Sequence, residues 1–266
     1  MPFADVNGLR LFHDEQGTGP PLLCVMGLAS DHQAWGLQLP AFAERFRTIV
    51  FDNRDTGQST MCDADYEITD LADDALALAD ALQLDAFHLL GISLGSAVAQ
   101  HVALRAPERI RTLTLAATWG GTAPAYARMR ADVWEREVRR STTEEWLEEM
   151  MLLTLSEQLF ESEEAIAEIK RMTVENPHPQ PTDALIRQIR ATSRHDVRDR
   201  LGELQMPVHV ISGDRDVLIP VWKGEEVAER VEHATMTVLR GIGHAMNMER
   251  VDQFNGAVLG WLAERG

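Results

Sequence analysis

The amino-acid sequence predicts an α/β fold in which helices flank a mainly parallel sheet of about eight strands. The first observation is that short apolar runs alternate with longer amphipathic stretches along most of the chain. The second is that these runs are apolar throughout, as in strands that are covered on both faces. The third is that one stretch in the middle of the chain shows no strand signal but several charged, helix-favouring segments. We therefore expect one α/β core with a helical insertion.

The predicted sheet begins with a hairpin and continues with buried strands. In the hairpin, Asn7-Gly8 joins residues 3–6 to residues 9–13, because this pair tolerates the positive φ angles of a two-residue turn. A helix is predicted at 69–82, where apolar residues recur on one face and the aspartates fall elsewhere. The buried strands are predicted at Pro21 to Met26, Thr48 to Phe51, Phe87 to Ile92, Ile110 to Ala116, Val208 to Gly213 and Thr235 to Leu239.

The alternation of strand and helix patterns is interrupted between about Trp119 and His195. This stretch contains charged, helix-favouring segments at 142–155 and 161–174, divided from the rest by the proline-rich residues 176–181. Strand signals resume afterwards, so the stretch lies within one fold. We expect residues 1–118 and 196–266 to form the core, and residues 119–195 to form a helical cap inserted in it.

Composition and charge indicate which partners are disfavoured and where the protein is expected to be located. The chain has 25 Lys and Arg against 42 Asp and Glu, a net charge of −17, which disfavours binding to nucleic acid or anionic lipid. Cys24 and Cys62 are the two cysteines, and Cys24 falls in a buried strand where a reduced thiol is expected. With no targeting segment and no apolar run of membrane-spanning length, we expect a cytoplasmic protein.

The segment Gly91-Ile92-Ser93-Leu94-Gly95 fits the pattern G-x-S-x-G. It follows a predicted strand and precedes a predicted helix at 96–105, which is the strand, turn and helix context of a nucleophile elbow. The flanking glycines allow a sharp turn that lifts the serine oxygen clear of the sheet, at the positive end of the helix. Ser93 is therefore the candidate nucleophile.

A serine hydroxyl needs a base, and His244 is the candidate among the 9 histidines. It lies in a glycine-flanked loop after the last predicted strand, from which its ring can reach over the sheet. An acid must fix the tautomer of that ring. Asp214 and Asp216 both follow the strand 208–213, at the carboxyl end of the sheet. We favour Asp216, because Asp214 directly follows a glycine and is better placed to bond turn amides.

With Ser93, Asp216 and His244 in this order, the chain resembles the α/β-hydrolase superfamily over nearly its whole length. The segments 25–35 and 51–59 are similar to those of small esterases, enol-lactonases and aclacinomycin-type methylesterases. The resemblance implies the α/β-hydrolase fold with a helical cap. It also implies an oxyanion hole, whose donors here would be the backbone amides of Leu28 and Leu94.

Two positions depart from the family pattern. Met26-Gly27 stands where the family usually has His-Gly, so contacts of that histidine are lost while backbone donors are kept. Asp55 stands at the first glycine of a D-x-R-G-x-G-x-S turn, which aspartate tolerates if the backbone there is left-handed. We interpret residues 52–59 as structural.

The insertion offers apolar side chains that are suited to covering a substrate, and most of them are expected to form its own core. The candidates for lining the pocket are Trp119, Met129, Trp146 and Met150. A carboxylate-bearing substrate would require arginines there. Surface ion pairs explain the available candidates, Arg128, Arg130 and Arg190, equally well. Without a metal-ligand motif or a dinucleotide fingerprint, we expect no metal and no cofactor.

These features predict a serine hydrolase that cleaves a carboxylic ester or lactone, with an apolar moiety, through an acyl-serine intermediate. The same three residues also serve carbon–carbon bond hydrolysis and cofactor-free perhydrolysis in this superfamily, and the motif does not separate these reactions. A hydrolase-like receptor that only binds a small molecule is the alternative of another class, which the retention of all three residues disfavours. The sequence does not predict an oligomeric state.

Overall fold

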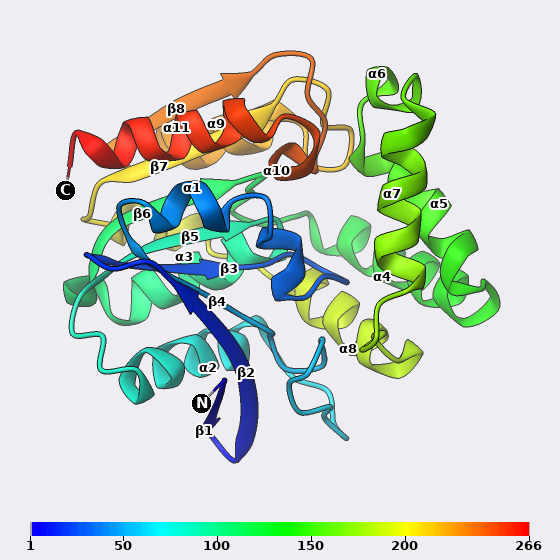
Figure 1. Ribbon diagram of the computed structural model, residues 1–266, viewed down its shortest axis with the longest axis horizontal. Helices are drawn as coiled ribbons and strands as arrows, with labels where there is room; N and C mark the ends of the chain where they lie inside the picture. Colours follow the sequence, from blue (N-terminus) through cyan, green and yellow to red (C-terminus); the bar gives the residue numbers. More distant parts are fainter. Residues whose placement is uncertain (1, 266) are drawn as a thin grey trace.

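The computed structural model describes residues 2–265 and confirms the predicted α/β sheet. Figure 1 shows the sheet and the helices that flank it. The sheet has eight strands in the order β1-β2-β4-β3-β5-β6-β7-β8, of which β3 to β8 run parallel and β1 and β2 pair antiparallel. The strands are β1 (Phe3–Val6), β2 (Leu9–Gln16), β3 (Pro21–Val25), β4 (Arg47–Phe51), β5 (Phe87–Ile92), β6 (Ile110–Ala116), β7 (Val208–Gly213) and β8 (Ala234–Leu239).

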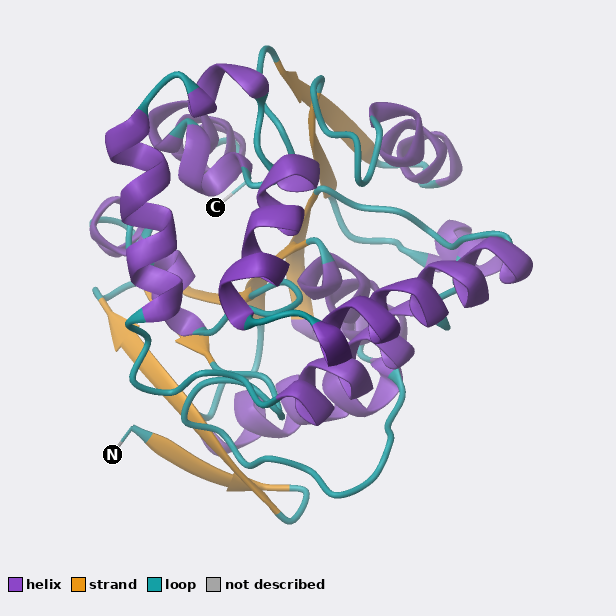
Figure 2. Ribbon diagram, turned by 90° about the vertical axis from the view of Figure 1, so that its right-hand side faces the viewer, coloured by secondary structure: helices purple, strands orange, loops and turns teal. Residues whose placement is uncertain are grey.

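Strands β3 to β7 are buried on both faces because helices pack on each side of the sheet, as Figure 2 shows. Along β3, Leu23 and Val25 join the core beneath one helical layer, while Leu22 and Cys24 join the core beneath the other. This alternation follows from the period of two residues in a strand. The first layer contains α2 (Ile68–Ala81), α3 (Leu94–Arg105) and α9 (Val221–Arg230); the second contains α1 (Leu39–Ala43), α10 (Met246–Glu249) and α11 (Val251–Ala263).

Five α-helices lie between β6 and β7 in the chain, and we call them the helical insertion. They stand beside the ends of the strands in Figure 1 and have a small core of their own, which includes Trp146 and Ile186. Within residues 2–265, no helix combines the length and hydropathy that a bilayer crossing requires. The insertion consists of α4 (Pro124–Arg140), α5 (Thr143–Thr154), α6 (Glu157–Phe160), α7 (Glu163–Val174) and α8 (Thr182–Ser193).

Three predicted boundaries differ from the structure by two or three residues. Strand β2 continues to Gln16, three residues beyond the predicted hairpin, because its second half pairs with β4. Helix α3 begins at Leu94 and not at Ser96, since the helix starts directly after the turn at Ser93. The predicted helix at 161–174 begins at Glu163, where Ser162 caps it, and the separate helix α6 precedes it.

Candidate active site

Ser93 lies at a sharp turn between β5 and α3. Its φ of 55° and ψ of −124° fall in a region that residues other than glycine rarely adopt. The two flanking glycines are required by close packing. A Cβ atom at Gly91 would collide with the carbonyl oxygen of Gly95, and one at Gly95 would collide with that of Val25. The G-x-S-x-G pattern therefore reflects the tight contact between strand and helix that holds the strained serine.

Ser93, His244 and Asp216 form a continuous chain of hydrogen bonds. The Nε2 atom of His244 lies 2.8 Å from Ser93 Oγ, and its Nδ1 atom lies 2.8 Å from Asp216 Oδ2. The other carboxylate oxygen of Asp216 accepts hydrogen bonds from the amides of Leu218 and Ile219, at 2.9 and 2.7 Å. Because both His244 and Asp216 are buried, the imidazole is held in one orientation between the hydroxyl and the carboxylate.

Asp214 lies on the same loop and has other partners. Its Oδ1 atom accepts a hydrogen bond of 2.6 Å from the Gly241 amide, and its Oδ2 atom lies 3.6 Å from Arg240 Nη1. These contacts join the loop after β7 to the loop that carries His244. The structure thus brings Asp216 to the histidine and leaves Asp214 to hold the turn.

The two amides that the family resemblance singles out flank the Ser93 turn. Leu94 is the first residue of α3, where an amide has no acceptor within the helix. On the opposite side is Gly27, where a Cβ atom would stand 3.8 Å from Ser93 Oγ. Among the hydrogen bonds between residues 2–265, none has the Leu28 amide as its donor. Met26, which replaces the family's histidine, is buried in the core under α1 and α11.

The loop that carries Leu28 is held on both sides by buried amide side chains. The Met26 carbonyl accepts a hydrogen bond of 3.3 Å from Asn53 Nδ2. The Ala29 amide donates to Gln188 Oε1 on α8, at 3.2 Å. Ala29 has a left-handed φ of 61°, so this contact with the insertion helps to keep an unfavourable backbone conformation. The position of the loop therefore depends on both the core and the insertion.

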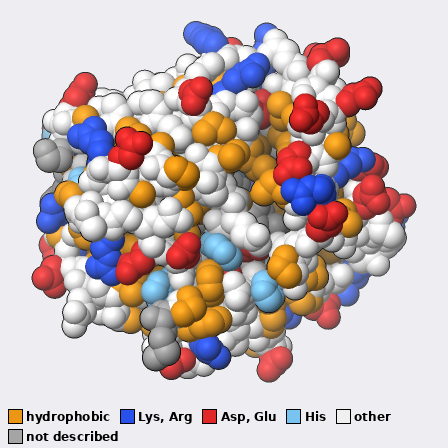
Figure 3. Space-filling view, viewed as in Figure 1, with side chains coloured by type: hydrophobic (Ala, Val, Ile, Leu, Met, Phe, Trp, Pro, Cys, Tyr) orange, Lys and Arg blue, Asp and Glu red, His pale blue; other side chains and the backbone are white. Residues whose placement is uncertain are grey.

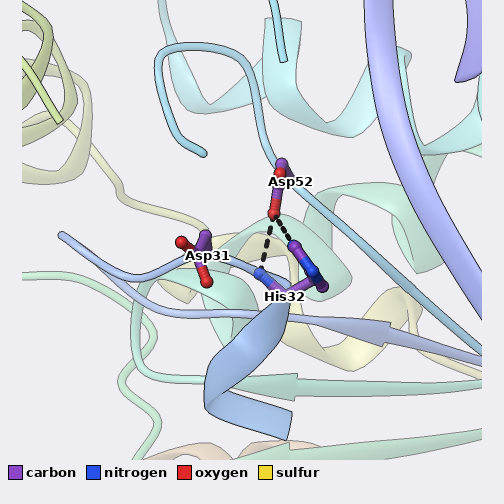
Figure 4. Close-up of side chains that lie close together, drawn as sticks. All are labelled: Asp31, His32 and Asp52. Atoms are coloured by element: carbon purple, nitrogen blue, oxygen red, sulfur yellow. Dashed lines mark hydrogen bonds and ion pairs between the residues drawn. The ribbon is translucent and has the colours of Figure 1, made fainter. Parts of the chain in front are cut away.

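Asp31, His32 and Asp52 form a second polar cluster, shown in Figure 4. Asp52 Oδ1 accepts a hydrogen bond from the His32 amide and lies 2.7 Å from His32 Nδ1, while its Oδ2 accepts from the Gln58 amide. Asp31 accepts hydrogen bonds from the Gln33 amide and from Asn176 Nδ2. Because both carboxylates are engaged in these bonds, the cluster serves to fix neighbouring loops.

The environment of His32 favours its protonated form. Burial lowers the pKa of His32, but the hydrogen bond to Asp52 and the charges of Asp52 and Asp31 outweigh burial and raise this pKa above its usual value. His32 is half-buried and its charged form is balanced by Asp52. Residues 52–59 are predicted to be structural, and no signal in the sequence identifies Asp31 or His32 as their partners.

Asp55 shows how the departure from the family turn is accommodated. Its φ is 68°, so the backbone has the left-handed conformation in which aspartate can replace the glycine of this turn. The fully buried carboxylate forms a two-point ion pair with Arg187 of α8, with N–O distances of 2.8 and 3.0 Å, and accepts a further hydrogen bond from the Cys62 amide. This contact, which joins the core to the insertion, was not predicted.

The four side chains predicted to line a pocket lie in different places. Trp146 and Met150 belong to the core of the insertion, against which Leu28 also packs. Trp119 is buried in the core of the sheet, with its ring edge-on to His195. Met129 is 69 % exposed. The structure therefore brings only Trp146 and Met150 into one cluster with Leu28, because Trp119 precedes α4 and Met129 faces away from that core.

Comparisons with known proteins agree with this architecture. The sequence profile of a family described as alpha/beta hydrolase fold matches residues 20–251. A protein of Rhizobium rhizogenes named "Putative carbamate hydrolase RutD" is 31 % identical over 246 residues, covering 92 % of this chain and 93 % of its own length. One with the same name from Azorhizobium caulinodans is 26 % identical, and the match covers 99 % of both chains.

Solved structures give the same result. A hydrolase from Pseudomonas aeruginosa PA01 superposes with a TM-score of 0.88 at 29 % identity, covering 98 % of this chain and 97 % of that one. A thermophilic esterase from Thermogutta terrifontis has a TM-score of 0.88 at 26 % identity, covering 99 % and 97 %. The family profile spans most of the sheet, the Ser93 turn and the loop of His244, and from this match we conclude that the chain belongs to the alpha/beta hydrolase fold family.

Proposed function

We propose that the protein is a serine hydrolase that cleaves a carboxylic ester or lactone through an acyl-serine intermediate. The observation that carries this proposal is the chain of hydrogen bonds from Ser93 through His244 to Asp216, with Ser93 on a strained turn. A binding protein has no need of a histidine held between a serine and a buried carboxylate. The retained geometry therefore favours catalysis over simple binding.

In the proposed reaction, His244 Nε2 takes the proton of Ser93 Oγ as that oxygen attacks the substrate carbonyl. Asp216 stabilises the imidazolium that forms, and the amides of Leu28 and Leu94 stabilise the negative oxygen of the tetrahedral intermediate. His244 then gives its proton to the leaving alcohol. Water, activated by the same histidine, attacks the acyl-serine and releases the acid, and no cofactor takes part.

A carbamate is a second candidate substrate, because relatives that align over nearly the whole chain carry carbamate hydrolase in their names. Its carbonyl carbon is open to the same attack by Ser93, and the proposed steps are unchanged up to the acyl-serine, which here would be a carbamoyl-serine. Esters and carbamates with the same leaving group, tested side by side, separate the two candidates. If the carbamate is turned over faster, the preferred substrate is a carbamate and the roles proposed for Ser93, His244 and Asp216 are unchanged.

Replacement of Ser93 by alanine tests the mechanism. We expect Ser93→Ala to fold like the wild type and to lose at least about 10³-fold in kcat on p-nitrophenyl butyrate, because the attacking oxygen is gone. A fluorophosphonate probe should label Ser93 in the wild type and leave the variant unlabelled, as peptide mapping by mass spectrometry would detect. Activity above a few per cent of wild type in the variant, or no labelling of the wild type, would reject the proposal.

A further inference from the structure

Arg130 on α4 differs from the other arginines in residues 2–265. It is the only arginine there that is not exposed and yet has no carboxylate within ion-pair distance; the others that are not exposed are all paired. Its guanidinium lies 5.9 Å from the ring centroid of Tyr126 and 5.2 Å from that of Trp134. Burial lowers the pKa of Arg130, which means that its charge is poorly compensated.

Lys223 supplies a second cation close to Arg130. It lies in the first turn of α9, its side chain is 15 % exposed, and its Nζ donates a hydrogen bond of 2.9 Å to the Gly121 carbonyl. Burial lowers the pKa of Lys223; Glu226, at 3.9 Å, acts against this, and the charges of Arg198 and Arg130 lower the pKa further. The positive charges of Arg130, Lys223 and Arg198 thus act on one another, with Glu226 and Asp196 compensating part of them, in a chain whose net charge is −17.

Lys223 and the Gly121 carbonyl follow the carboxyl ends of β7 and β6, the edge of the sheet that also carries Ser93 and Asp216. Trp134, on which Arg130 stacks, packs in the core of the insertion that also contacts Leu28. Lys223 follows the loop whose amides hold Asp216. In Figure 3, hydrophobic side chains gather around the hollow between the main body and the insertion. Lys223 therefore lies at the strand ends, where ligands of open α/β sheets bind, and Arg130 on the insertion is close enough to it for its charge to lower the pKa of Lys223.

Of the three arginines that the sequence offered as carboxylate ligands, only Arg130 is both partly buried and unpaired. Arg128 is exposed, two residues away on α4. Arg190 is fully engaged by Glu135 at 2.7 Å and Asp65 at 3.2 Å. An anion at Arg130 would replace the water that its guanidinium has lost and would accept two parallel hydrogen bonds, the geometry that arginine provides for carboxylates.

We propose that Arg130, assisted by Lys223, binds a carboxylate of the substrate, so that the preferred substrate is an anionic ester or lactone. This inference rests on the proposed function, because it assigns the part of the substrate that does not react with Ser93. Arg130 sets specificity by holding that carboxylate and takes no part in the proton transfers. Neutral esters remain substrates and are bound without this contact.

The test compares Arg130→Gln with the matched control Arg128→Gln on p-nitrophenyl half-esters of succinate, glutarate and adipate, and on neutral p-nitrophenyl butyrate. We expect Arg130→Gln to raise KM at least about 10-fold for the half-ester that is the best wild-type substrate, and to change kcat/KM for the butyrate less than 2-fold. Arg128→Gln should leave every value within 2-fold of wild type. An equal loss on neutral and anionic substrates, or no loss on any half-ester, would overturn the anion site.

A binding measurement separates this inference from the proposed function. In the Ser93→Ala background, monomethyl esters of the same three diacids are titrated into the protein and the heat of binding is recorded. We expect Arg130→Gln to weaken the tightest of these ligands about 10-fold and Arg128→Gln to leave it unchanged. If Ser93 proves irrelevant to turnover but the binding difference is found, the proposed function fails and the anion site stands. Equal binding by the Arg130 and Arg128 variants rejects the anion site itself.

Discussion

The two aspartates that follow β7 have different partners, and this difference predicts different effects of removing their charges. Asp216→Asn keeps the size of the side chain but favours the wrong imidazole tautomer of His244 and removes its counter-charge. We expect a folded variant with kcat reduced about 10⁴-fold. Asp214→Asn weakens the bond to the Gly241 amide, so we expect near-normal kcat and a stability loss of about 1 kcal/mol.

Steady-state kinetics and urea unfolding of the two variants provide the measurement. If Asp214→Asn were folded and inactive while Asp216→Asn stayed active, the acid would have to be reassigned to Asp214. The sequence favours Asp216, although both residues follow the same strand. The structure places Asp216 Oδ2 2.8 Å from His244 Nδ1, whereas Asp214 turns to the Gly241 amide.

At the scale of elements, α8 is fastened to the core by the ion pair between Arg187 and Asp55. Arg187→Met would leave the fully buried Asp55 carboxylate with no counter-charge, and we expect it to lower the free energy of unfolding by about 3–5 kcal/mol. The double variant Arg187→Met with Asp55→Gly removes both charges and places glycine at a φ of 68°. It should therefore lose less stability than the single variant.

Urea unfolding of the wild type, the single variant and the double variant measures these differences. A double variant as unstable as Arg187→Met would mean that the uncompensated charge is not the cause of the loss. A further comparison with Asp55→Gly alone completes the cycle and gives the coupling between the two residues.

The elements were predictable where their signals are local in the chain. The apolar run of β5 followed by G-x-S-x-G predicted the strand, the turn and the helix around Ser93, because the motif and its flanking elements are continuous in the chain, although the contact that requires Gly95 is with the distant Val25. The contacts that were missed join distant segments. Asp55 and Arg187 are separated by 132 positions, and Ala29 and Gln188 by 159. Neither helical periodicity nor a motif indicates which face of α8 meets which loop.

At the scale of the whole molecule, buried uncharged histidines predict sensitivity to acid. Burial, assisted by the neighbouring His101, lowers the pKa of His195 to about 3, and burial lowers the pKa of His88 and His209 to about 4. In the unfolded chain a histidine binds its proton near pH 6.5, so below that pH the unfolded state binds more protons than the folded state. The contribution of these three histidines to stability is therefore complete above about pH 6.5 and falls towards pH 3, by about 1.4 kcal/mol per pH unit for His195.

The measurement is the urea midpoint between pH 7 and pH 5, for the wild type and for His195→Gln. Glutamine can keep a donor for the Trp119 carbonyl, which lies 3.1 Å from His195 Nε2, and it does not titrate. We expect this variant to lose less stability on acidification than the wild type, and the exposed His178→Gln to behave like the wild type. Identical pH dependence in all three proteins would show that His195 does not contribute to acid unfolding.

The two ends of the helical insertion meet where it leaves and rejoins the core. Val197 donates a hydrogen bond of 2.7 Å to the Gly120 carbonyl, and Gly121 pairs with Asp196 in an isolated antiparallel bridge. The intervening helices therefore connect β6 to β7 as one long loop whose two ends are bonded to each other. The entropy cost of closing a loop rises by only about 0.6 kcal/mol for each doubling of its length. A change in the length of the insertion therefore need not move β6 or β7. The loops that carry Leu28 and His244 stay tied to it, because the Ala29 amide donates to Gln188 and the Ala245 amide donates to the Thr154 carbonyl.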